Sequence, residues 1–84
     1  MKREDFEQLS IAERGMLLIS NGKHLTQIKK GNHLLNLYAM DDFFVEVIYS
    51  ILTDKIDRIS IINDLSRIDH YIDERQKEER PHLN

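Results

Sequence analysis

The side chains of this chain that could do chemistry are four histidines and a set of scattered carboxylates. The histidines are His24, His33, His70 and His82. Their spacing matches neither His-x-x-x-His nor His-Glu-x-x-His, the pairs that hold a metal ion from one helix face. Asp69, His70, Asp73 and Glu74 could form a carboxylate–imidazole cluster, but we expect a solvated helix face there. The sequence therefore predicts no metal site.

Nucleophilic and phosphate-binding motifs are also missing from the sequence. The three glycines, Gly15, Gly22 and Gly31, are scattered, so they form no phosphate-binding loop. No serine lies in a nucleophile-elbow context. A domain of this size also has little room for a deep pocket. We expect a protein that is not an enzyme, with no cofactor and no small-molecule substrate.

Length and composition limit the number of domains and the location that we expect for this protein. Eighty-four residues make one domain, which we place at residues 1–80 with a short tail at 81–84. The chain has no cysteine, which fits a reducing, cytoplasmic location. The charged N-terminus does not read as a signal peptide, and the aliphatic run 16–19 is too short to span a bilayer. With a net charge of −3, nucleic acid is a poor partner.

An amphipathic helix is predicted on each side of residues 24–62. The first begins at a capping box, Ser10–Glu13, and ends at Gly22. A turn before it brings Phe6 to the core. Its expected core stripe has helical spacing and consists of Leu9, Ala12, Met16 and Ile19. The second helix is capped by Asn63 and has a narrow apolar stripe with Tyr71 alongside: Leu65, Ile68 and Ile72.

Four strands in series fill the segment between these helices. A two-residue turn at Gly31 pairs Ile28 with Leu35 and Thr26 with Leu37. A loop over residues 51–55 likewise pairs Val47 with Ile59 and Val45 with Ile61.

The middle hairpin leaves two registers open. A three-residue loop at 40–42 pairs Leu37 with Val45, whereas a two-residue loop places Glu46 opposite Leu37. We expect the first register, because it keeps apolar residues together on one face and a one-residue slip would reverse both faces.

The expected fold is therefore α+β, a four-stranded antiparallel meander flanked by an N-terminal and a C-terminal helix. The sequence leaves open whether the two helices share one face of this sheet or lie on both faces. If they share one face, the other face has no cover. Because large apolar patches are rare on monomers, we expect a protein interaction module, a homodimer or a subunit of an assembly. The expected interface residues are Leu34, Asn36, Tyr38, Phe44, Glu46 and Ile48.

The alternative is a sheet that binds single-stranded nucleic acid, with Tyr38 and Phe44 as stacking platforms. Lys29 and Lys30 would give it a basic edge. Glu46 in the middle of the face and the net negative charge argue against this alternative.

The segment from Asn36 to Val47, with Asn-Leu-Tyr followed by Asp-Phe-Phe-Val-Glu-Val, resembles a pattern in small bacterial proteins. Those proteins share the layout of an N-terminal helix, a strand meander and a C-terminal helix. The resemblance implies the same fold and a bacterial cytoplasmic protein. It implies no activity.

Overall fold

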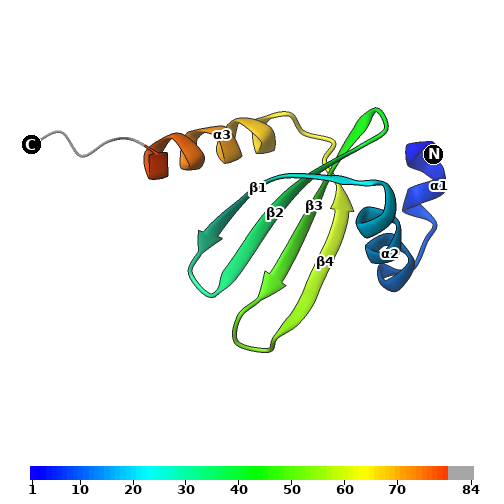
Figure 1. Cartoon of the computed structure of the whole chain (residues 1–84), viewed down its shortest axis with the longest axis horizontal. Coiled ribbons are helices and arrows are strands. Elements are labelled where there is room, and N and C mark those ends of the chain that lie inside the picture. The colour runs from blue at the N-terminus through cyan, green and yellow to red at the C-terminus, as the bar shows by residue number, and fades with distance from the viewer. Residues whose placement is uncertain (80–84) are drawn as a thin grey trace, which may run out of the picture.

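The structure, a computed structural model, describes residues 1–79, and for residues 75–79 it describes the backbone only (Figure 1). The elements are α1 (Arg3–Glu7), α2 (Ile11–Asn21), β1 (Lys23–Lys30), β2 (His33–Met40), β3 (Phe43–Ser50), β4 (Lys55–Ile61) and α3 (Ser66–Glu79). The strands form one antiparallel sheet in the order β1-β2-β3-β4. This confirms the predicted α+β meander; the predicted tail at 81–84 lies outside the described residues.

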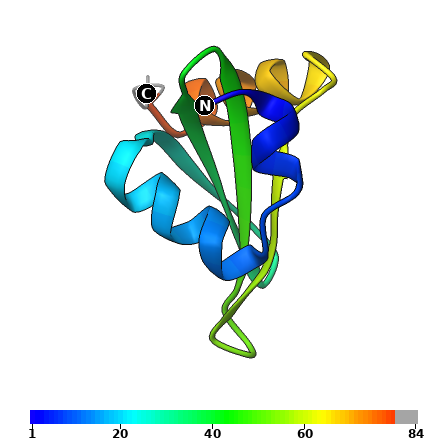
Figure 2. The same ribbon diagram turned by 90° about the vertical axis from the view of Figure 1, so that its right-hand side faces the viewer.

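The helices lie on opposite faces of the sheet. Phe43, Val45 and Val47 of β3 pack with Phe6 of α1 and Leu18 of α2. Between them in β3, Glu46 contacts Tyr71 of α3. Since successive side chains of a strand point to opposite faces, α3 covers the face that α1 and α2 leave open. Figures 1 and 2 show α3 beside β1, well away from α2. Of the two helix arrangements that the sequence left open, the one with helices on both faces forms, so neither face of the sheet is left without a helix.

The outer strand pairings agree with the sequence, and the middle one does not. Ile28 pairs with Leu35, and Val47 pairs with Ile59, as predicted. In the middle hairpin, Leu37 lies opposite Glu46, so the two-residue loop is the one that forms. Asp41 adopts a φ of 52°, in the left-handed region that tight two-residue hairpin turns use and that aspartate tolerates.

The inner side of α2 also differs from the prediction. Leu18 is buried and Leu17 packs against the same core, next to Gly15, whose Cα faces Ile59. Of the expected core stripe, Leu9 packs against the core as predicted, but the other three residues point outward: Ala12 is exposed, and Met16 and Ile19 are 69% and 86% exposed. The predicted capping box is present, with Ser10 accepting from the Glu13 amide and Glu13 from the Ser10 amide. Phe6 is fully buried, as predicted.

Arg14 joins both N-terminal helices to the sheet. Its guanidinium donates to the backbone carbonyls of Phe6, Glu7 and Ile59 at 3.3, 2.7 and 2.5 Å. It also lies 5.6 Å from the centre of the Phe6 ring. A single side chain therefore fixes the positions of α1, α2 and β4 relative to one another.

The start of α3 is two residues later than expected. Asp64, not Asn63, accepts a hydrogen bond from the Ser66 amide at 3.0 Å. That bond lowers the pKa of Asp64 below its usual value. The Asn63 side chain instead accepts from Arg3 of α1. Tyr71 of α3 is buried, and Ile68 of the predicted stripe packs against the same core cluster. Of the other two stripe residues, Leu65 lies just before α3 and is 72% exposed, and Ile72 is 48% exposed.

Candidate interaction surfaces

The six residues predicted as one interface lie on both faces of the sheet. Because β2 and β3 pair one residue away from the expected register, Leu34, Asn36 and Tyr38 point to the α2 face. The other three point to the α3 face: Phe44, Glu46 and Ile48. No single partner surface can therefore bury this set, and the predicted outward patch does not form.

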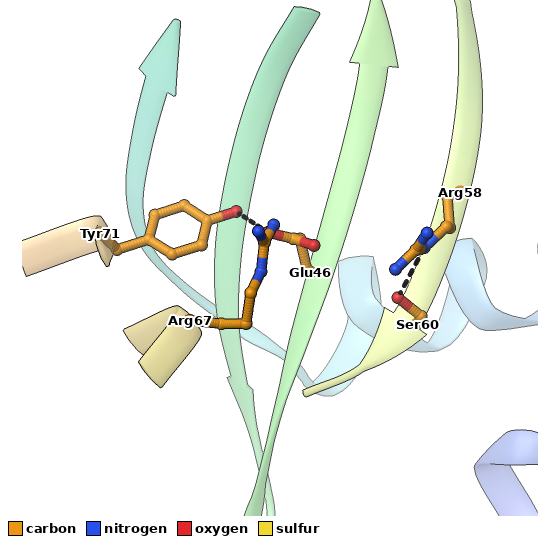
Figure 3. A network of polar contacts seen from close by, with 5 residues as sticks. All are labelled: Glu46, Arg58, Ser60, Arg67 and Tyr71. Atoms are coloured by element: carbon orange, nitrogen blue, oxygen red, sulfur yellow. Dashed lines mark hydrogen bonds and ion pairs between the residues drawn. The ribbon is translucent and has the colours of Figure 1, made fainter. Parts of the chain in front are cut away.

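Glu46 is an anchor for α3 rather than part of an open surface (Figure 3). Its side chain is 2% exposed and accepts hydrogen bonds from Tyr71 at 2.9 Å and from Arg67 at 2.5 Å. Burial and the bond to Glu46 raise the pKa of Tyr71 well above its ordinary value. Both groups are engaged with each other, so the network holds the helix against the sheet.

A second polar cluster lies on the α2 face, beside the area that α2 covers. The Asn36 side-chain oxygen lies 3.0 Å from His24 Nε2 and accepts from Gln27 Nε2 at 2.7 Å. The His24 ring meets the Tyr38 ring edge-on, with centroids 5.0 Å apart. Gln27 pairs with Asn36 on this face, whereas Glu46 pairs with Ser60 on the α3 face, so the β2–β3 register separates the two polar pairs.

An apolar groove runs between α3 and the sheet. Its volume is about 410 Å³, and it is lined by Leu25, Thr26, Leu37, Phe44, Ile68, Tyr71 and Ile72. The buried Thr26 hydroxyl beside it has no hydrogen-bond partner among the described residues. The groove offers apolar contact but no convergent polar groups that could orient a reacting substrate.

The outer side of α2 is the most exposed apolar helix face of the described chain. Ala12, Met16 and Ile19 form a continuous stripe at i, i+4 and i+7. A shallow hollow of about 450 Å³ lies beside Met16 and is lined by Met1, Leu9, Glu13, Met16, Leu17 and Ser20. We call this stripe the outer face of α2.

Neither of the charged residues of α2 belongs to this outer face, although Glu13 borders it. The helix has two, and both are engaged within the domain: Glu13 in the capping box and Arg14 with three backbone carbonyls. The Ser20 hydroxyl also turns back to the Met16 carbonyl at 3.0 Å. A helix that is apolar on two sides is typical of a buried position, yet one side of α2 has no cover in the described chain.

Residues 1–79 contain neither a cluster of metal ligands nor a membrane-spanning helix. In this range, no group of three or more histidine or acidic side chains could hold a metal ion. No helix in the same range is long and apolar enough to cross a membrane. His33 lies 3.3 Å from Asp57, and Lys30 lies 3.0 Å from Glu74, both at the surface.

These features define a small α+β domain with an uncovered apolar helix face and an apolar groove on opposite sides of its sheet. Comparison with protein-family models, with curated proteins and with solved structures finds no match. The resemblance to small bacterial proteins therefore stays a prediction. Sequence reasoning missed the outer face of α2 as a surface because it placed that stripe in the core.

Proposed function

We propose that this chain is a small, non-enzymatic protein–protein interaction module that self-associates through the outer face of α2. The observation that carries the proposal is the exposure of Met16 and Ile19, 69% and 86%, on a helix whose charged side chains are engaged elsewhere. The absence of cysteine supports a reducing compartment such as the cytoplasm.

The strength of the association follows from the area available. Burying one methionine or isoleucine side chain contributes about 1.5–3 kcal/mol, so four of them in a symmetric pair contribute about 6–12 kcal/mol. Association itself costs about 4–15 kcal/mol in lost motion. The most favourable combination of the two ranges leaves about 8 kcal/mol, a Kd of about 1 μM, and less favourable combinations give weaker dimers or none; for so small a face we expect a weak dimer with a Kd of about 10 μM to 1 mM.

Sedimentation equilibrium from about 10 μM to 1 mM tests this proposal over the expected Kd range. We expect the average mass of the wild type to rise with concentration, and Ile19→Glu to remain monomeric. The matched control is Leu52→Glu, because Leu52 is 76% exposed in the β3–β4 loop, away from α2. Ile19 is so exposed that its variant should keep the wild-type urea midpoint. A wild type that stays monomeric throughout would refute self-association.

Single-stranded nucleic acid binding is the second candidate, and one observation favours it. Glu46 lies on the α3 face of the sheet. The strand residues on the opposite face, which carries Tyr38, therefore include no carboxylate; their polar and aromatic members are His24, Gln27, Lys29 and Tyr49. One observation argues against nucleic acid binding. Lys30 forms an ion pair with Glu74, so the basic edge that would contact phosphates has little net positive charge.

Fluorescence anisotropy with labelled short DNA and RNA decides this second candidate. We expect no binding at physiological ionic strength. Salt-sensitive binding that is lost in the Lys29→Ala/Lys30→Ala variant would replace the interaction module with a nucleic-acid-binding protein, because phosphate contacts are those that release counterions.

A further inference from the structure

We propose that two copies of this chain pair α2 against α2 in antiparallel orientation, about a two-fold axis at Met16. In this arrangement Ile19 of each copy lies against Ala12 of the other. The inference rests on the proposed function, since it specifies how the outer face of α2 is covered. Its partner is a second copy of this chain.

The spacing of the stripe makes it complementary to itself. At a rise of 1.5 Å per residue, Ile19 lies about 4.5 Å beyond Met16 along the helix, and Ala12 lies about 6 Å before it. Reversal about Met16 therefore brings the large Ile19 beside the small Ala12 of the other copy. A parallel pair would instead set Ile19 against Ile19 and Ala12 against Ala12, which crowds one end and leaves a gap at the other.

Electrostatics also permits this pairing. Glu13 is exposed and lines the hollow beside Met16, whereas Arg14 is half-buried and donates to backbone carbonyls of its own domain. Reversal about Met16 offsets the two copies of Glu13 by about 9 Å along the helices, so the two carboxylates do not lie directly opposite each other. The antiparallel arrangement also opposes the two helix dipoles, which a parallel pair would align.

A cysteine-free chain allows a direct test by single-cysteine cross-linking. The variants are Met16→Cys, Ile19→Cys and the control Leu52→Cys, each oxidised at a concentration where the wild type sediments as a dimer. Disulfides need Cα atoms about 4.4–6.8 Å apart. In the antiparallel pair only position 16 meets its own copy, because the two copies of position 19 are offset by about 9 Å along the helices.

We expect most of the Met16→Cys protein to migrate as a covalent dimer on non-reducing gels, and Ile19→Cys and Leu52→Cys to remain monomeric. A mixture of Ala12→Cys and Ile19→Cys should give the mixed disulfide, identified by mass spectrometry. Cross-linking of Ile19→Cys with itself would overturn the antiparallel arrangement and leave the proposed function standing. A dimer with no cross-link at positions 12, 16 or 19 would exclude α2 as the interface. A monomeric wild type would refute both proposals.

Discussion

Replacing Arg67 by alanine tests how α3 is held on the sheet. Arg67 and Tyr71 are the two donors that the structure gives to Glu46, and the Glu46 side chain is 2% exposed. Without Arg67 the carboxylate keeps one neutral donor and loses its counter-charge. Such a group is destabilising because its hydration is not replaced.

The size of the effect follows from the burial of the two partners. Removing one partner of a fully buried ion pair costs about 3–5 kcal/mol. The Arg67 side chain is 44% exposed, so water can reach the vacated position, and we expect about 2–3 kcal/mol. Tyr71→Phe should cost about 1.5–2 kcal/mol, the lower part of the range for a hydrogen bond to a charged group. A domain of 84 residues has a total stability of about 4–13 kcal/mol, so either loss is measurable.

Urea denaturation followed by circular dichroism measures these losses. With a slope of about 1 kcal/mol per molar urea, the Arg67→Ala midpoint should fall by about 2–3 M. The matched control is Arg58→Ala, because Arg58 is exposed and, among the residues that the structure describes, donates a side-chain hydrogen bond to Ser60 alone, at 3.2 Å (Figure 3). Equal midpoints for Arg67→Ala and Arg58→Ala would refute both the anchoring of α3 and the β2–β3 register that buries Glu46.

Three further predictions concern the core, the N-terminal helices and pH. Arg14→Met should lower the free energy of unfolding by about 2–3 kcal/mol, because three backbone carbonyls lose a charged donor. A urea midpoint equal to that of the control Arg58→Met would contradict this. Leu37→Ala should lower the free energy of unfolding, measured by urea denaturation, by about 2 kcal/mol. This is the low end for a buried leucine, because Leu37 borders the groove and the site can relax. A loss under about 0.5 kcal/mol would show that Leu37 is not a core residue. The raised pKa of Tyr71 means that the unfolded chain loses this proton first, so stability should fall as the pH rises above about 10. Urea midpoints across this pH range should show a smaller fall for Tyr71→Phe, and an identical fall in both proteins would assign the effect to other groups.

Much of the fold could be predicted because its local signals agree with its tertiary structure. The capping box at Ser10, the turn at Gly31 and the apolar alternation of β3 and β4 each favour one local conformation. These signals fix the order of the elements and two of the three strand pairings. They require no knowledge of which surface a helix finally covers.

The β2–β3 register could not be predicted from alternation alone. Leu37 lies opposite Glu46 in the register that forms and opposite Val45 in the expected one, but alternate positions on both faces of β2 are apolar, so β2 itself favours neither register. What distinguishes the two registers is a residue far along the chain: Arg67 and Tyr71 of α3 provide the donors that make a buried Glu46 acceptable. When these donors are not known, the register that buries Glu46 is rejected, because burying a charged group without partners is costly.

The candidate site was missed for a related reason. Helical periodicity identifies an apolar stripe but not the side of the helix that meets the sheet. On α2 both Leu18 and Ile19 belong to apolar stripes, and the structure buries Leu18 in the core cluster that contains Ile59, to which Arg14 also donates a hydrogen bond. The side that α2 turns to the sheet is thus fixed together with contacts between residues about 45 positions apart in the sequence, which periodicity does not contain.

The Arg14 contact with Ile59 also bears on the solubility of the protein. β4 is an edge strand, and Ile62 donates to Phe44 of β3, so alternate residues such as Ile59 direct their backbone groups away from the sheet. Free backbone groups on an edge can recruit a strand from another molecule and start aggregation. By occupying the Ile59 carbonyl, Arg14 blocks one of the positions at which such growth would begin. The same side chain that assembles the N-terminal helices thus protects an open edge of the sheet.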